Sequence, residues 1–599
     1  MKEYTKTKEE RLNYFRDLYE NAKEKYSGVT DDLTRHMEQY RGSSAIDGSD
    51  VRAESVRNIT YEIVESQISS DIPLPRVECS CYSEKHNRNA KSIERLCTSV
   101  RDLLPFEEMN DLDERYTYIY GGSVWLVEWD CDLLRGRERG GVRVHCVSPR
   151  DFIPQPSVSS VTDMEYCFLR FTTTKGELVR KYGILQSEVD KSDLESRGTD
   201  DDPDPDGECV TVVLCFYKDE DGEVGEFIFS GDLVVRDLPK YYRRKYRVCK
   251  SCGKAEEICT CGSGEFEYRD AQYEEPTHII PLSDGSFISP IAESTPGGST
   301  LENRTRLPYY TPKTFPIAIR RNTSSEGRLL GQSDCEYIRP EQQAINKLET
   351  RILQKLLRAG ITPIVPEDAS ITLNNSVFGQ LIKMKPGESA AQYGKVDTTP
   401  DISQDIAEAE RLYDQAKRII GISDAFQGND GGYSESGVAR QLRISQASGR
   451  LESKKKMKYT AYSAIDRLIF EHFLAFADEP RALSYKDAYG RTHSAEFNRY
   501  DFLEYDPITG EYVYDDSYLF SVDLNGGAEY QREALWERNL ENLRAGTLGD
   551  PESPVTLLRY WQCQERAHYP YARENVEYFK DEVEKAGETQ EEEWTQKSL

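Results

Sequence analysis

Apolar residues recur every three to four positions in a segment near the middle of the chain. This spacing predicts a helix over residues 331–357, with apolar positions at Ile345, Leu348, Ile352, Leu353 and Leu356. Ser333 or Asp334 can cap the start of this helix, and Gly360 can end it.

A second helix is predicted over residues 401–422. Asp401 or Ser403 can cap it, and Gly421 follows its last apolar residues. The segment between the two helices, residues 358–400, contains several prolines and glycines, which are typical of turns. We therefore expect two long helices that flank a small β-containing unit.

A third helix is predicted over residues 436–478, after a glycine-rich loop at residues 423–435. At about 100° per residue, five basic side chains fall within an arc of about 80° on this helix: Arg440, Arg443, Arg450, Lys454 and Lys458. A basic stripe on an acidic protein is a candidate DNA-contacting surface. A solvated face, or pairing with an acidic neighbouring subunit, explains the same pattern. Beyond Lys458 the stripe turns apolar, through Ala461, Ile465 and Leu468.

The hydrophobic period changes near Gly121 in the N-terminal part, residues 1–330. Before this glycine the spacing predicts helices within residues 6–41, from Ser55 to the break at Pro73, and over 84–104 and 108–120. After it, alternation of apolar and polar residues predicts strands at 123–132, 140–156, 165–172 and 209–217, and a hairpin within 222–246.

The C-terminal part contains another alternating segment followed by helical periodicity. Residues 479–525 are predicted to form a β-meander with turns at Tyr489-Gly490 and Thr509-Gly510. Residues 526–599 are predicted to be helical and to end in an acidic tail. The fold class expected from these patterns is α+β.

Length and charge narrow the class of protein. A chain of 599 residues is too long for one core, so two to four structural units are expected. Its apolar runs are too short to span a bilayer, and its N-terminal residues lack a signal-peptide core, so we expect a cytosol-like compartment and no membrane. The net charge of −29 argues against a general nucleic-acid-binding surface.

Four of the fourteen cysteines form two close pairs, Cys249 with Cys252 and Cys259 with Cys261. Four thiolates at this spacing predict a structural Zn²⁺ site that staples an insertion at residues 245–265. They leave no open position for water, which argues against a catalytic zinc. A reduced, metal-free loop and disulfide pairing are the alternatives.

Motifs of common enzyme sites are missing from the sequence. It contains no GxxxxGK[ST] phosphate loop, no HExxH pair and no GxSxG nucleophile elbow, and its histidines form no paired cluster with carboxylates along the chain. We therefore predict no catalytic residues and no enzymatic activity.

Three stretches carry a resemblance to a known family. They are GQSDCEYIRPEQQAINKLETRIL from Gly331, NDGGYSESGVARQLRISQASGRLESKKK from Asn429, and VSPRDFIP from Val147 to Pro154. Together they resemble the portal proteins of tailed bacteriophages, the head-to-tail connector family. Cys335 stands where an aliphatic residue is commoner, and the four-cysteine insertion is not a general feature of that family.

The resemblance implies the portal fold and assigns each segment a place in it. Residues 331–357 and 401–422 would be the stem helices and 358–400 the clip. Residues 423–435 would be the tunnel loop, with Gly428, Asn429, Asp430, Gly431, Gly432 and Tyr433 at its centre. The helix over 436–478 would run beneath a mixed α/β wing made of residues 1–330 and 479–525. Residues 526–599 would form a helical crown.

The resemblance also implies a function and partners. The chain would form a dodecameric ring at one capsid vertex of the virion, assembled in the cytoplasm of a host bacterium. Double-stranded DNA would pass through the ring during packaging and ejection, and the acidic wall would let it slide. The partners would be the terminase large subunit, a head-tail adaptor, and the major capsid and scaffolding proteins. The alternatives are a zinc-containing nucleic-acid-processing enzyme and a monomeric scaffold or adaptor.

Overall fold

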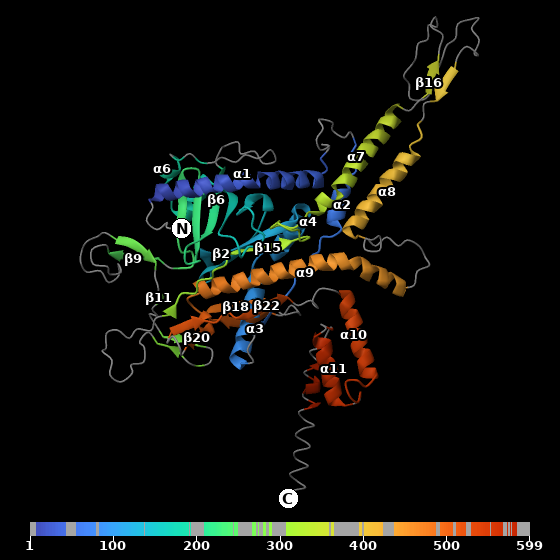
Figure 1. The fold of residues 1–599 in the computed structure, drawn as a ribbon. Helices are drawn as coiled ribbons and strands as arrows, with labels where there is room; N and C mark the ends of the chain where they lie inside the picture. Colours follow the sequence, from blue (N-terminus) through green and yellow to red (C-terminus); the bar gives the residue numbers. More distant parts are fainter. Residues whose placement is uncertain are drawn as a thin grey trace, which may run out of the picture.

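A computed structural model gives the fold of the chain (Figure 1). It describes residues 7–583 with gaps, of which the longest are 44–54, 195–208, 250–265, 290–306, 365–393 and 423–436. The side chains of residues 437–451 also lie outside the described set. The described part mixes helices and strands, which confirms the α+β class.

The largest sheet has five antiparallel strands in the order β4-β5-β6-β7-β8. Their bounds are Phe152–Pro154, Tyr166–Thr174, Cys209–Lys218, Val224–Ser230 and Leu233–Leu238. Helix α1 (Lys8–Tyr40) covers one face, and its Phe15 ring stacks on Phe227 with centroids 4.5 Å apart. The helix starts at a capping box formed by Thr7 and Glu10. This element is therefore one continuous helix.

A second sheet has three strands in the order β15-β2-β3, with bounds Ile317–Arg321, Gly122–Arg135 and Glu138–Val147. It lies between α4 (Phe106–Tyr120) and the long helix α9 (Gly437–Phe476). Trp125 of β2 is fully buried and contacts Tyr462 of α9, with ring centroids 5.7 Å apart. Helix α3 (Glu84–Leu103) also packs on α9, so one core joins both halves of the chain.

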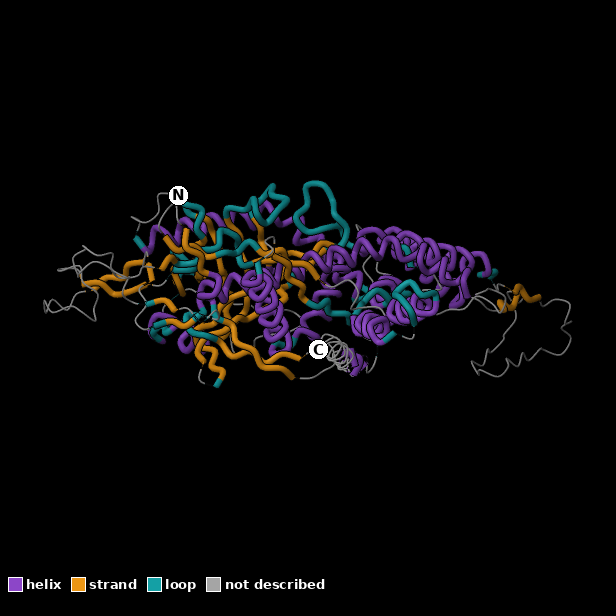
Figure 2. Tube along the Cα trace, turned by 90° about the horizontal axis from the view of Figure 1, so that it is seen from below, coloured by secondary structure: helices purple, strands orange, loops and turns teal. Residues whose placement is uncertain are grey.

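Two long helices form an arm that leaves this body (Figure 1). They are α7 (Asp334–Arg358) and α8 (Ser403–Ile420), and the short strands β16 (Ile361–Ile364) and β17 (Gly394–Asp397) pair at the far end. α7 and α8 run antiparallel: Lys355 pairs with Asp405 near the far end of the arm, and Gln415 donates a hydrogen bond to Glu341 near the body. The two helices pack along each other, and the arm also extends beyond the body in Figure 2.

The strands after α9 do not form the predicted continuous meander. β18 (Arg481–Lys486) pairs with β19 (Thr492–Phe497), and β20 (Leu503–Asp506) pairs with β21 (Glu511–Tyr514), as two separate hairpins. The last strand, β22 (Tyr518–Val522), pairs instead with β1 (Pro75–Cys79) from the N-terminal part. Alternation along the chain indicated the strands but could not indicate this distant partner.

Two further helices, α10 (Glu529–Arg544) and α11 (Pro554–Arg566), pack against each other below the body in Figure 1. The helix expected from Ser55 is shorter than predicted: α2 spans Ile59–Glu65 and leaves Ile68 outside. The remaining described elements are short: α5 (Lys175–Tyr182), α6 (Gln186–Val189), β9 (Lys245–Cys249), β10 (Phe266–Asp270), β11 (Tyr273–Glu274), β12 (Ile280–Pro281), β13 (Phe287–Ile288) and β14 (Leu307–Pro308).

Candidate functional site at the foot of the arm

The arm joins the body at Gly331, where three backbone segments meet. A Cβ atom at Gly331 would lie 2.5 Å from the carbonyl oxygen of Thr323 and 2.8 Å from that of Gly121. Gly121 itself ends α4 in the left-handed conformation, with φ of 88°. Only glycine allows this close approach without a shift of the backbone.

Ser333 and Asp334 then attach the first turn of α7 to the body. The Ser333 hydroxyl donates to the carbonyl oxygens of Tyr118 and Ile119 at the end of α4, and accepts from the Cys335 amide at 3.0 Å. Ser333 is thus the cap of α7, as one of the two predicted choices. The Asp334 carboxylate accepts from Asn322 at 2.7 Å and from Gln67 at 2.9 Å.

Lys454 of α9 supplies the positive charge for Asp334. Its Nζ lies 2.7 Å from Oδ2 of Asp334 and 2.9 Å from the side-chain oxygen of Gln67. The residue is only 8% exposed. The prediction that Lys454 contacts DNA is therefore wrong for this fold, because a buried carboxylate holds its ammonium group inside the protein.

Lys458, one turn further along α9, is also buried and paired with a carboxylate. Its Nζ pairs with Glu114 at 2.9 Å and donates to the Asp71 carbonyl, and it is 3% exposed. Glu114 also pairs with Arg320 at 2.8 Å, and Arg320 reaches Asp113 as well. The prediction of DNA contact is thus wrong for Lys458 too.

We call Asp113, Glu114, Arg320, Asp334, Lys454 and Lys458 the joint network. Burial lowers the pKa of Lys458, although the Glu114 charge opposes the shift. For Glu114, burial alone would raise the pKa, but the adjacent Arg320 and Lys458 outweigh it and hold the pKa below its ordinary value. Every charged side chain in this network has a partner of opposite charge among the described residues. The network therefore holds α4, α7, α9 and β15 together and has a structural role.

The sequence did contain a sign that Lys454 and Lys458 are buried, namely the apolar end of the basic stripe. Ala461, Ile465 and Leu468 continue the same face of α9 and are all buried. A stripe that turns apolar enters the core, and its last basic residues enter with it. The rest of the joint network had no signal along the chain, because Asp334 lies 120 positions from Lys454 and Glu114 lies 344 positions from Lys458.

Other predicted site residues lie outside the described residues. Arg440, Arg443 and Arg450 belong to α9, but their side chains are not described. The same holds for the tunnel-loop residues Gly428, Asn429, Asp430, Gly431, Gly432 and Tyr433, and for Cys252, Cys259 and Cys261. Cys249 ends β9, with only its backbone described. The zinc site and the first half of the basic stripe therefore stay predictions.

The two arm helices do not carry the acidic surplus of the chain. Together they contain eight acidic and eight basic residues. The net charge of −29 therefore comes from other segments of the chain.

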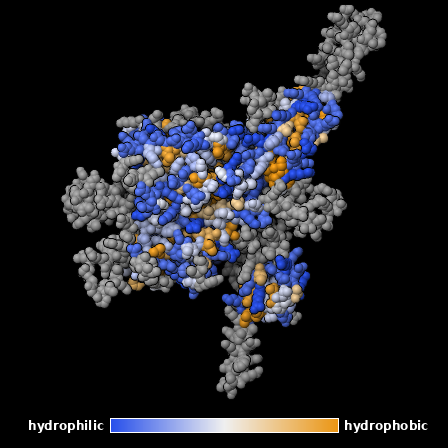
Figure 3. All heavy atoms as spheres, viewed as in Figure 1, coloured by the Kyte–Doolittle hydropathy of each residue, from blue (hydrophilic) through white to orange (hydrophobic). Residues whose placement is uncertain are grey.

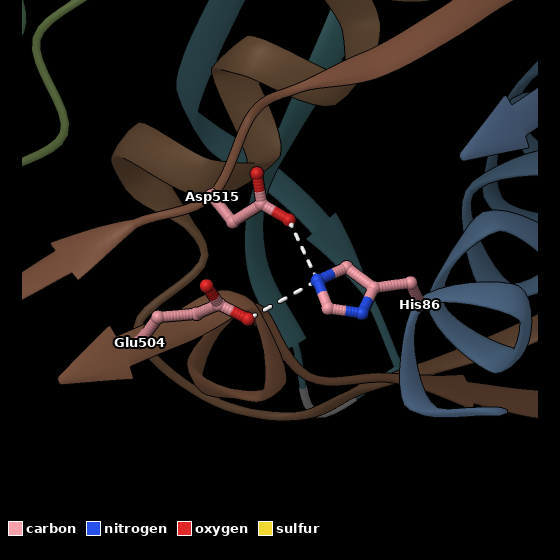
Figure 4. Close-up of side chains that lie close together, drawn as sticks. All are labelled: His86, Glu504 and Asp515. Atoms are coloured by element: carbon pink, nitrogen blue, oxygen red, sulfur yellow. Dashed lines mark ion pairs between the residues drawn. The ribbon is translucent and has the colours of Figure 1, made fainter. Parts of the chain in front are cut away.

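One group with metal-ligand chemistry was missed by the sequence reasoning. His86 lies close to Glu504 and Asp515 (Figure 4), more than four hundred positions away in the chain. The statement that no histidine pairs with a carboxylate cluster holds along the sequence but is wrong in three dimensions.

No helix among the described residues combines the length and apolar character needed to cross a bilayer. Searches against protein-family models and against curated protein sequences find no match for this chain.

Proposed function

We propose that this chain is a portal protein, the subunit of a ring-shaped channel at one vertex of a tailed-phage capsid. The observation that carries the proposal is the arm: two antiparallel helices that leave a mixed α/β body and end in paired strands. A ring of such arms makes a tubular wall with a docking tip, whereas an enzyme or adaptor has no evident need for one. The order of elements agrees with the resemblance seen in the sequence.

Exposed apolar side chains on the arm support an assembly of several chains. Leu356, Leu357 and Ile406 are 50%, 73% and 45% exposed in the single chain. Figure 3 shows hydrophobic residues on the arm surface among hydrophilic ones. Packing each arm between two copies of itself would bury them, as in a head-to-tail interface that closes into a ring.

Within this proposal the parts have separate roles. The arm is the stem, and residues 358–400 are the clip that docks the terminase large subunit and later the head-tail adaptor. Arg440, Arg443 and Arg450, with the loop at 423–435, contact DNA transiently in the channel. Lys454 and Lys458 hold the stem to the wing instead. Major capsid and scaffolding proteins contact the outside of the ring.

Native mass spectrometry and negative-stain imaging of the full chain test the proposal. We expect closed rings of about twelve copies. A chain that stays monomeric at every concentration would refute the portal function and leave the scaffold or adaptor, whereas nuclease or other processing activity would favour the zinc-containing enzyme.

A matched pair of substitutions tests whether the arm forms the ring interface. Leu357→Asp should reduce ring formation, because burial of a leucine contributes roughly 1.5–3 kcal/mol and the loss recurs at every interface. Leu134→Asp is the control, since Leu134 is 71% exposed near a hairpin end that contacts β18 rather than the arm. Equal ring yields from both variants would contradict the assignment of the arm to the interface.

A further inference from the structure

A histidine and two carboxylates converge at the junction of α3 with the β20–β21 hairpin (Figure 4). His86 lies in the first turn of α3, Glu504 lies in β20, and Asp515 directly follows β21. One ligand atom from each side chain lies within 4.8 Å of the other two. The side chains are partly accessible, at 18%, 47% and 13% exposure respectively.

Both carboxylates approach the same nitrogen of the imidazole. Oε1 of Glu504 lies 3.2 Å from Nε2 of His86, and Oδ2 of Asp515 lies 3.5 Å from it. Nδ1 is buried and has no hydrogen-bond partner among the residues that the structure describes. A protonated imidazole has one N–H on each nitrogen and would be best satisfied with one carboxylate on each. Convergence on a single nitrogen fits three ligand atoms that share one cation.

The spacing of the donor atoms fits a cation of ordinary size. Oε1 and Oδ2 lie at most 4.8 Å apart, so the point in their plane that is equidistant from Nε2, Oε1 and Oδ2 lies within about 2.4 Å of each, close to Zn–N and Zn–O bond lengths. An imidazole ligand favours a transition metal over Mg²⁺ or Ca²⁺, which prefer oxygen alone. Three protein ligands leave further positions for water.

The surrounding contacts hold the donors in place. Oδ1 of Asp515 accepts hydrogen bonds from the amide and hydroxyl of Ser517, which turns Oδ2 toward His86. On α3, Lys85 donates to the Leu503 carbonyl at 3.3 Å and Asn89 to the Asp501 carbonyl at 3.2 Å. The first turns of α3 are therefore fixed to the hairpin on both sides of His86, and Lys85 is directed to a carbonyl oxygen.

The two carboxylates also bring two negative charges to the site. Burial raises the pKa of the nearby Tyr518, a hydrogen bond from Asn89 opposes the shift, and the charges of Asp515 and Glu504 add to it. A divalent cation would balance the two carboxylates.

We propose that His86, Glu504 and Asp515 bind a divalent transition-metal cation, with Zn²⁺ as the probe, and that the ion clamps α3 to the β20–β21 hairpin. The clamp joins residues more than four hundred positions apart and fixes the N-terminal part of the body to the strands that follow α9. This site uses none of the four cysteines, and the proposal does not depend on the portal function.

The test measures zinc bound to the full-length protein in two backgrounds. The first is the natural sequence, and the second carries Cys249→Ser and Cys252→Ser, so that zinc held by the cysteine segment is removed from the count. In each background, His86→Ala, Glu504→Gln and Asp515→Asn are compared by metal analysis after dialysis against Zn²⁺ and by thermal unfolding with and without Zn²⁺. The control is His145→Ala, because the one carboxylate that pairs with His145 in the described part of the chain is Glu128, at 3.5 Å.

We expect each of the three variants to lose one equivalent of zinc in both backgrounds and to lose the rise in Tm that Zn²⁺ gives, while His145→Ala keeps both. The two isosteric variants, Glu504→Gln and Asp515→Asn, guard against a loss caused by misfolding, because they keep the side-chain volume. Zinc content and Tm response equal to those of the parent in all three variants would overturn the proposal and leave a histidine ion pair. Loss of zinc only in the cysteine variants would overturn it as well.

Discussion

Lys454→Ala removes the one ammonium group that neutralises Asp334 in the joint network. In the folded protein the Asp334 side chain is 1% exposed and that of Lys454 is 9% exposed. Without the lysine, Asp334 keeps hydrogen bonds from Asn322 and Gln67 but has no described cation within salt-bridge distance. A buried carboxylate without a neutralising cation is costly, so the variant should loosen the foot of the arm.

The size of the effect follows from the burial of the pair. Removing one partner of a buried ion pair costs about 3–5 kcal/mol, and the two remaining hydrogen bonds place this case near the lower end, at about 3 kcal/mol. Lys456→Ala is the matched control on the same helix. Lys456 pairs with Glu452 at 3.1 Å, but both side chains are more than 60% exposed, so its loss should cost less than about 0.5 kcal/mol.

Hydrogen exchange followed by mass spectrometry is the suitable assay, since a chain of this length does not unfold in one step. A local cost of about 3 kcal/mol predicts about a hundred-fold faster exchange in the first turns of α7 and the middle of α9. The control should leave these rates within about three-fold. If Lys454→Ala and Lys456→Ala give the same exchange rates, Lys454 is not part of a buried joint. The prediction that Lys454 contacts DNA would then stand again.

Two further substitutions test other parts of the fold. Gly331→Ala should lower Tm, at a cost of about 2 kcal/mol or more, because its Cβ would meet two carbonyl oxygens. The control, Gly28→Ala, lies inside α1 with nothing within 4 Å of its Cβ and should raise Tm slightly. A higher Tm for Gly331→Ala than for Gly28→Ala would contradict the close approach at Gly331. Burial lowers the pKa of His472 to about 4, so between pH 6.5 and 4 the unfolded chain binds the proton that the folded chain excludes. The free energy of unfolding should therefore fall as the pH drops through this window, by up to about 3 kcal/mol from this group. His472→Gln should reduce the loss of Tm between pH 6.5 and 4.5. The control, His145→Gln, changes an exposed histidine and should not reduce that loss. Equal pH dependence in both variants would show that His472 is not buried in its neutral form.

Local signals in the sequence determined the helices of the arm and their ends. Periodicity, a serine cap and a terminal glycine act within a few residues, so they are visible without any knowledge of the partner. α7 begins directly after Ser333, and α8 ends at Gly421 in the left-handed conformation. The same locality explains why the predicted helix over 436–478 lies within two residues of the observed α9, Gly437–Phe476.

The tertiary structure alone decided what each face meets. The basic stripe of α9 placed Lys454 and Lys458 on one face, but only the approach of Asp334 and Glu114 from distant segments turned that face inward. The pairing of β22 with β1 and the approach of His86 to Glu504 and Asp515 also join residues that are distant in the sequence. A charge is buried only where the fold supplies an opposite charge and hydrogen bonds, and this supply comes from residues hundreds of positions away, which no local pattern contains.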